Sequence, residues 1–129
     1  MTLPDALLNW IPALLATVVL EAPFWMWARR GAARAVDAVH VVTPSLVTHP
    51  VVWFVSPVVV VVVPMCQPDP MACYPAQIAI AELFAIAVEA AWWQSLSNDR
   101  WRRAIGISVA ANGFSVAAGY ALRAMGAPL

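Results

Sequence analysis

The residues from Ile78 to Trp93, IAIAELFAIAVEAAWW, form an almost entirely apolar run that is interrupted by two carboxylates. Glu82 and Glu89 are seven residues apart, so in a helix they lie on one face, two turns from each other. An apolar run of this length is typical of a helix that crosses a membrane. An ionisable side chain at bilayer depth is energetically costly and usually faces a bundle interior or a cavity. The run therefore predicts a membrane-spanning helix, and its two carboxylates predict where the chemistry of the protein occurs.

The composition of the whole chain favours a membrane protein. Of its 129 residues, 63% are hydrophobic and 11% are charged, which leaves too little polar surface to cover a soluble core. The length suits one domain over residues 1–129. The net charge of zero provides no basic face for phosphates and argues against a nucleic-acid partner. The N-terminal segment lacks the positive region of a secretory signal peptide, so we expect it in the mature protein.

Four apolar stretches predict an all-α fold, a bundle of four transmembrane helices. They cover about residues 6–28, 42–63, 75–96 and 103–122, each near the roughly 20 residues that a bilayer core requires. Two connections carry groups of arginines: Arg29, Arg30 and Arg34, then Arg100, Arg102 and Arg103. Because cytoplasmic loops are enriched in positive charge, we expect a multi-pass protein of a bacterial-type inner (plasma) membrane with both termini extracytoplasmic.

Proline, small residues and tryptophan predict how the spans bend and pack. Three prolines make the second span a bent helix: Pro44, Pro50 and Pro57. In this span Thr48 can hydrogen-bond a backbone carbonyl near the proline. The fourth span has a face of small residues that lets helices approach closely: Gly106, Ala110, Gly113 and Ala117. Tryptophans at the span ends are predicted to anchor at the membrane surfaces: Trp10, Trp25, Trp27, Trp92 and Trp93.

The segment from Met65 to Pro75 is a proline-rich loop on the side opposite the arginines. It contains the only two cysteines of the chain, Cys66 and Cys73. Their spacing is not that of a redox motif, and a metal site of two cysteines without a nearby histidine is not expected. In an oxidising compartment such a pair favours a disulfide. We therefore predict a Cys66–Cys73 disulfide.

Polar side chains from all four spans are predicted to lie at nearly the same depth. Counting about 1.5 Å per residue from the arginine-rich ends places four of them in one layer: Glu21, His49, Glu89 and Asn112. Glu82 lies roughly 10 Å further out on the face of Glu89. With two neighbouring hydroxyl groups, the predicted proton, cation or ligand site consists of Glu21, Thr48, His49, Glu82, Glu89, Asn112 and Ser115.

Three chemistries would use such a layer. A carboxylate relay would pass protons or bind a small cation, with Glu89 and Glu82 as successive stations. A divalent metal held by Glu21, His49 and Glu89 is an alternative, because mixed oxygen and nitrogen ligands suit zinc, iron or manganese. The third role is structural, in which hydrogen bonds from these groups join helices or contact a partner subunit.

The predicted function is a proton- or cation-linked transporter, a channel component or a proton-relay subunit, built as a homo-oligomer or beside a partner membrane subunit. One rival is a non-catalytic subunit or assembly factor of a larger complex. The other is an intramembrane metal-binding protein or enzyme. Enzymatic activity is the less favoured class, because no serine or cysteine stands beside a base. Haem is not expected, since His40 and His49 lie near one end of a single span, and no glycine-rich loop predicts a nucleotide.

Overall fold

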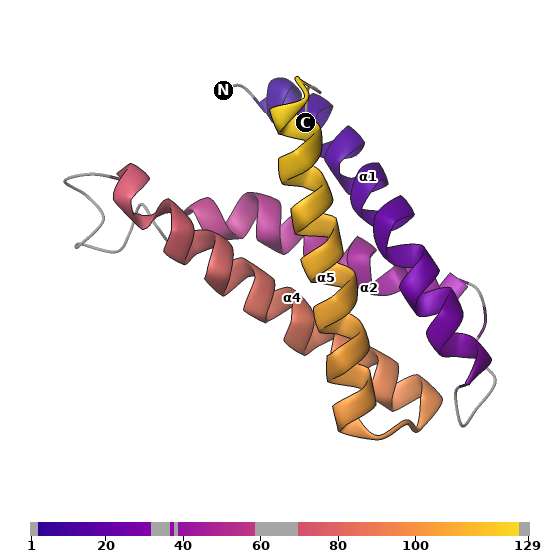
Figure 1. The fold of residues 1–129 in the computed structure, drawn as a ribbon. Coiled ribbons are helices and arrows are strands. Elements are labelled where there is room, and N and C mark those ends of the chain that lie inside the picture. Colours follow the sequence, from indigo (N-terminus) through magenta and orange to yellow (C-terminus); the bar gives the residue numbers. More distant parts are fainter. Residues whose placement is uncertain (1–2, 32–36, 38, 59–69, 127–129) are drawn as a thin grey trace.

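The computed structural model describes residues 3–31, 37, 39–58 and 70–126 (Figure 1). Its elements are α1 (Leu3–Arg30), α2 (Val39–Pro50), the π-helix η1 (Val51–Val55), the 3₁₀-helix η3 (Pro70–Cys73), α4 (Tyr74–Ser97) and α5 (Trp101–Ala124). No strand occurs within the described ranges. Four helices are long and apolar enough to cross a membrane: Leu8–Arg30, Val39–Val58, Tyr74–Ser97 and Trp101–Ala124. The predicted all-α architecture with four helices of spanning length is confirmed.

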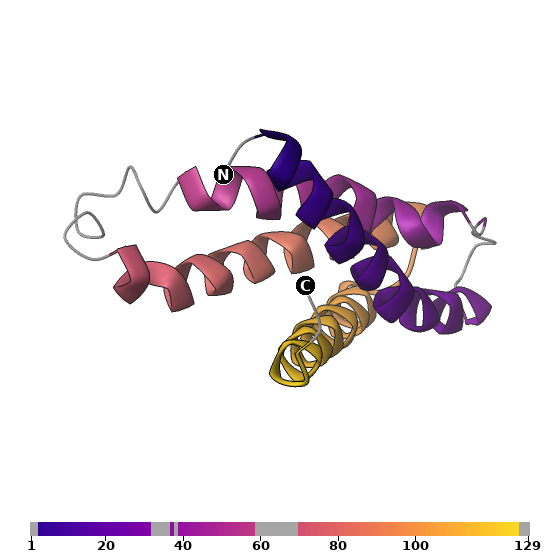
Figure 2. The same ribbon diagram turned by 90° about the horizontal axis from the view of Figure 1, so that it is seen from above.

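The long helices pack as a ring in which each contacts two neighbours. α1 contacts α2 and α5, and α4 contacts the same two helices. The helices converge at the end where α1 ends, α2 begins and the turn between α4 and α5 lies, and they spread apart toward the end at which α1 begins and α5 ends (Figure 1 and Figure 2). We call the first of these the loop end and the second the open end.

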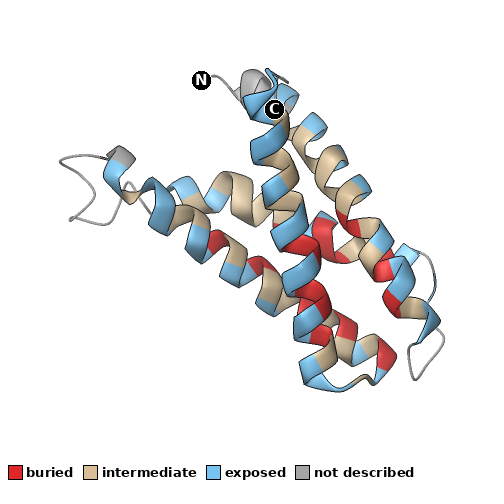
Figure 3. Cartoon of the chain, viewed as in Figure 1, coloured by how far each residue is buried: buried red, intermediate tan, exposed pale blue. Residues whose placement is uncertain are grey.

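The hydrophobic core lies at the loop end, where the buried residues gather (Figure 3). Trp25 and Trp93 are fully buried there, with ring centroids 5.3 Å apart. Alanines around them let the helices approach closely: Ala28, Ala90, Ala104 and Ala111. The prediction that Trp25 and Trp93 anchor at a membrane surface is wrong, because both rings fill the space between helices.

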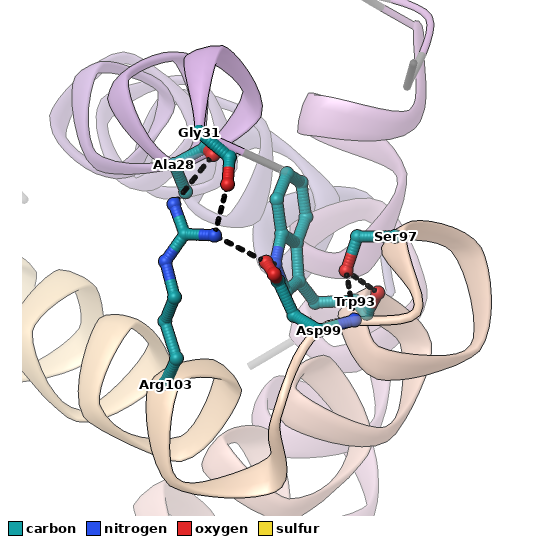
Figure 4. A network of polar contacts seen from close by, with 6 residues as sticks. All are labelled: Ala28, Gly31, Trp93, Ser97, Asp99 and Arg103. Carbon is teal, nitrogen blue, oxygen red and sulfur yellow. Dashed lines mark hydrogen bonds and ion pairs between the residues drawn. The ribbon is translucent and has the colours of Figure 1, made fainter. Parts of the chain in front are cut away.

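A polar clamp around Arg103 closes the loop end (Figure 4). Its guanidinium donates to the carbonyl oxygens of Gly31 at 2.6 Å and Ala28 at 3.0 Å, at the end of α1 where the last carbonyls lack a partner in a following helical turn. The Ala28 carbonyl also accepts from the N–H of Gly31 at 3.1 Å. The guanidinium also pairs with the Asp99 carboxylate at 2.7 Å. Asp99 accepts a further hydrogen bond, from the indole of Trp93, at 3.0 Å. The clamp therefore connects α1, the turn between α4 and α5, and the buried core.

Asn98 explains why α4 stops where this clamp can form. Its φ of 55° is left-handed, a conformation that asparagine tolerates at the end of a helix. Its N–H donates to the carbonyl oxygen of Gln94 at 3.0 Å. The resulting short turn places Asp99 within one helical turn of Arg103, so that the two side chains meet.

The second span departs from a regular α-helix directly after one of its three predicted prolines. α2 passes into η1 directly after Pro50, and the N–H of Ser56 donates to the carbonyl oxygen of Val51, five residues back. This wider turn follows the position at which proline removes a backbone donor. The Thr48 hydroxyl donates to the carbonyl oxygen of Pro44 at 3.1 Å, which confirms the predicted side-chain contact beside the proline.

Two predictions fall partly outside the described residues. Residues 59–63 of the predicted second span are among those not described. Cys73 ends η3 and is not a free thiol, but its predicted partner Cys66 also lies outside the described residues. The Cys66–Cys73 disulfide therefore stays a prediction.

The small-residue face predicted for the fourth span does not pack within the described part of the chain. Its members are exposed: Gly106, Ala110, Gly113 and Ala117. Among the described residues, nothing from a neighbouring element lies within 4 Å of a Cβ built on Gly106 or Gly113. The adjacent face turns inward instead, because Ser108 and Asn112 hydrogen-bond Glu89 on α4. The prediction of close packing by this face is wrong for a single chain.

Candidate functional site

A cavity of about 260 Å³ lies between the four helices, on the open-end side of the hydrophobic core. It is lined by residues 13–21 of α1, by the second half of α5, and by segments of α2, η1 and α4. In each helix the core residues follow on the loop-end side, so the core forms the floor of the cavity. All seven residues of the predicted site line this cavity: Glu21, Thr48, His49, Glu82, Glu89, Asn112 and Ser115. Their function stays a prediction.

Among the three carboxylates of the site, Glu89 has the most described hydrogen-bond donors. Its side chain is buried, at 1% exposure. Its Oε1 accepts from the hydroxyl of Thr48 at 3.3 Å, and its Oε2 accepts from the Ser108 hydroxyl at 3.1 Å and from Asn112 Nδ2 at 2.5 Å. Because the donors belong to α2 and α5, the Glu89 carboxylate links three helices. These donors satisfy a buried carboxylate, which would otherwise be strongly disfavoured.

Two of the three donors to Glu89 are shared with the backbone. The Thr48 hydroxyl lies 3.1 Å from the carbonyl oxygen of Pro44, and the Ser108 hydroxyl lies 3.2 Å from that of Ile86. A hydroxyl has a single proton to donate, so each can switch between Glu89 and a carbonyl oxygen. Asn112 has two N–H groups, and its contact with Glu89 is independent of this exchange.

Glu21 is buried beside α2 and has two hydroxyl groups as hydrogen-bond partners, those of Ser45 and Ser115. The hydroxyl of Ser45 donates to its Oε2 at 2.6 Å, and the side chain is 2% exposed. Sequence reasoning missed Ser45, although a signal was present. Ser45, Thr48 and His49 have the i, i+3, i+4 spacing of one helical face, so the residue that faces Glu21 lies one turn before the predicted pair.

Glu82 differs from the other two carboxylates in its surroundings. It is half-buried and, among the described residues, none donates a hydrogen bond to it. A second cavity, of about 320 Å³, adjoins the first. Five residues line both cavities: Val52, Trp53, Tyr74, Ile78 and Glu82. Glu82 therefore lies at the junction of the two cavities, and its carboxylate accepts no hydrogen bond from a described residue.

His49 belongs to a row of aromatic rings on the cavity wall. The indole N–H of Trp10 donates to His49 Nδ1 at 2.8 Å. An indole nitrogen is only a donor, so Nδ1 carries no proton and the neutral imidazole has its proton on Nε2. The imidazole also stacks on Trp53, with centroids 6.0 Å apart and 14° between the planes. Trp10, predicted only as an anchor, thus positions His49, which in turn positions Trp53.

The geometry does not favour the predicted metal alternative. Within the described ranges, no three His, Cys, Asp or Glu side chains are close enough to hold an ion together. His49 Nδ1 is engaged by Trp10, and both oxygens of Glu89 accept hydrogen bonds. Glu21, His49 and Glu89 share a cavity without forming a coordination shell.

The described lining of the cavity is rich in carboxyl groups and partly aromatic. Three carboxylates face a single arginine, Arg123, in the last turns of α5. Trp53, Tyr74 and Tyr120 contribute rings, and most of the remaining lining is apolar. An excess of carboxylates in a low-dielectric cleft attracts cations. The cavity can therefore bind a positive charge or pass protons between carboxylates.

Comparison with protein-family models, with curated proteins and with solved structures finds no match. The function is therefore inferred from the cavity and from the helices that form it.

Proposed function

We propose that this protein is a small multi-pass membrane transport protein that takes up protons or a cation at the carboxylates of its cavity. The observation that carries the proposal is the convergence of Glu21, Glu82 and Glu89 on one cavity between helices of spanning length. Ionisable groups at membrane depth mark ion pathways and proton relays far more often than surface positions do.

The three carboxylates have different roles in this proposal. Glu89 is held by donors from two other helices, and Glu21 is held by Ser45. Glu82 has no described donor and lies at the junction of the two cavities. A carboxylate without fixed donors exchanges its partner more readily, because no hydrogen bond within the protein has to break. Glu82 is therefore the entry station, and Glu89 is the inner one.

The positions of the arginines predict how the proposed protein is oriented in the membrane. Arg29, Arg30, Arg100 and Arg102 all lie at the loop end. By the positive-inside rule this end faces the cytoplasm of an inner (plasma) membrane, and both termini are extracytoplasmic. The cavity then opens outward, and the tryptophan core closes the cytoplasmic side. An Asp37→Cys variant should react with a membrane-impermeant thiol reagent only after lysis. Labelling of Asp37→Cys in intact cells would reverse this orientation.

A flux measurement tests the proposed function. Purified protein in liposomes loaded with a pH-sensitive dye should dissipate an imposed proton or cation gradient faster than empty liposomes. Glu82→Gln keeps the size of the side chain and removes its charge, and it should slow this flux at least roughly tenfold. Asp37→Asn makes the same chemical change at an exposed position outside the cavity and should leave the flux unchanged. Wild-type flux in a folded Glu82→Gln protein would contradict the proposal.

One observation favours a second candidate, a non-catalytic membrane subunit or assembly factor. The donors that surround Glu89 join three helices, as structural hydrogen bonds between membrane helices do, and the exposed small-residue face of α5 suits close packing against a second copy or a partner subunit. In that case the liposomes with protein would be no more permeable than empty ones. The protein would then co-purify with a membrane partner after mild solubilisation.

A further inference from the structure

The two cavities that meet at Glu82 are larger than an inorganic ion requires. Their volumes are about 260 and 320 Å³, near the lower end of the roughly 300–1,000 Å³ of small-molecule sites. A water molecule, by comparison, occupies about 30 Å³. The described residues also lack a cluster of metal ligands. Size and donor set together favour an organic occupant.

One face of α4 has apolar and aromatic side chains in the same row as the carboxylate of Glu82. Tyr74, Ile78 and Glu82 have i, i+4, i+8 spacing on α4, so they lie along one face over about 12 Å. All three line both cavities, as does Trp53 from η1. A proton or a bare ion would use only the carboxylate. An occupant with a charged end and an apolar body would use the whole stripe.

The indole ring of Trp53 can stabilise a positive charge placed over its face. Tryptophan has the most favourable face for a cation among the aromatic side chains. Its ring is oriented by the stacked imidazole of His49, and the hydrogen bond from Trp10 shows that this imidazole is neutral. Among the described residues, the second cavity has no basic side chain in its lining. On the side of the second cavity, no described basic side chain therefore competes with a cation for Glu82, whereas Arg123 lines the first cavity.

We propose that the joined cavities bind an organic ammonium ion, with the charged nitrogen at Glu82 and an apolar or aromatic substituent against Trp53, Ile78 and Tyr74. The proposal rests on the proposed function and names its substrate class. The ammonium group would replace the missing donor of the Glu82 carboxylate, and the substituent would fill the apolar stripe toward the open end.

Binding to the wild-type full-length protein in lipid nanodiscs is the first test, measured by calorimetry with empty nanodiscs as the blank. Benzyltrimethylammonium combines charge and substituent, tetramethylammonium has the charge alone, and benzyl alcohol has the substituent alone. We expect benzyltrimethylammonium to bind at least roughly tenfold more tightly than either of the others, because only it uses both Glu82 and the aromatic faces. Similar affinities for all three compounds would overturn the proposal, as would a response to sodium or zinc chloride alone.

Substitutions in the joined cavities test where the organic ammonium ion binds. Glu82→Gln should weaken binding of benzyltrimethylammonium at least roughly tenfold, and Trp53→Leu about fivefold. Asp37→Asn should bind like the wild-type protein. Helical content measured by circular dichroism shows whether each variant is folded, and the comparison of probes on the wild-type protein does not depend on any variant. Wild-type affinity in a folded Glu82→Gln protein would overturn the assignment.

The outcomes separate this inference from the proposed function. If the liposomes pass protons in a Glu82-dependent way but no organic ammonium binds, the substrate class is wrong and the transport proposal stands. If benzyltrimethylammonium binds at Glu82 but no flux occurs, the ligand class is right and the transport proposal is wrong.

Discussion

The loop end and the open end of this bundle contain the same kinds of side chain in opposite roles. At the loop end, Trp93 is fully buried and Asp99 is paired with Arg103. At the open end, Trp53 lines two cavities and Glu82 has no described donor. Aromatic rings and carboxylates are therefore structural where the helices converge and available to a ligand where they spread apart. The spacing between helices, rather than residue type, decides the role.

Local sequence features explain why the helices lie closer together at the loop end than at the open end. At the loop end, alanines allow close approach of the helices, and the Arg103 clamp fixes the end of α1 against the next turn. Toward the open end, α2 is interrupted by Pro50 and η1.

Removing a tryptophan should have very different consequences at the two ends. Trp93→Ala should lower the free energy of unfolding by about 3 kcal/mol or more, because it empties the centre of a packed core. Trp53→Ala should lower it by less than about 1 kcal/mol, because its ring already borders open space. Unfolding of both variants in the same detergent measures the difference. Equal losses would mean that the open end is also a packed core.

The Arg103 clamp should contribute to stability without affecting the cavity. Arg103→Gln should lower the free energy of unfolding by about 1–2 kcal/mol, since it loses charged hydrogen bonds to two carbonyls and a partly exposed ion pair. Arg103→Lys should recover only part of this, because an ammonium cannot reproduce the planar fork of the guanidinium. The binding of benzyltrimethylammonium should stay at its wild-type value in both variants. A change in that affinity would show that the two ends are coupled.

The two carboxylates of α4 should differ in their contribution to stability. Glu89→Leu removes the acceptor for Thr48, Ser108 and Asn112 and should lower the free energy of unfolding by about 1–2 kcal/mol. Glu82→Leu should change it by less than about 0.5 kcal/mol, because no described donor loses its partner. Thermal unfolding in detergent compares the two variants. A larger loss for Glu82→Leu would contradict the roles assigned to these residues.

The smallest effect is expected on the exposed face of α5. Gly113→Leu should change the unfolding free energy by at most about 0.5 kcal/mol, because no described neighbouring element lies within 4 Å of its added Cβ. Ala111→Leu, two residues earlier on the same helix, is the matched control. Ala111 is fully buried, and overpacking it should destabilise the protein by about 1–3 kcal/mol. Native mass spectrometry shows whether Gly113→Leu also disrupts an oligomer, which would identify this face as an interface between subunits.

The sequence was sufficient to predict the helices and the convergence of polar residues. Span lengths follow from bilayer thickness, and depth follows from counting residues along a helix. Both quantities depend only on position along the chain. The sequence alone could therefore assign four residues to one layer: Glu21, His49, Glu89 and Asn112. The structure places all four on the same cavity.

The sequence was not sufficient to predict which side of each helix faces the others. That depends on pairs of residues far apart in the chain, such as Arg103 with Gly31 or Trp10 with His49. A helix with small residues on one face and polar residues on the next can rotate either way. In α5 the hydrogen bonds to Glu89 decide the rotation, which leaves Gly113 outside.

The π-helix after Pro50 has a consequence for how this protein can vary. A π turn is an α-helix that has accepted one additional residue, and each residue rotates an α-helix by about 100°. The wider turn absorbs this rotation, so deleting a single residue within Val51–Val55 would restore ordinary winding and leave the direction of the helix beyond it unchanged. Ser56, which accepts a hydrogen bond from Gln77 of α4 at 3.2 Å, would still face Gln77. Deleting one residue from the regular helix before Pro50 would instead turn Ser56 away by about 100°. The second span therefore tolerates in η1 a change of length that it does not tolerate in α2.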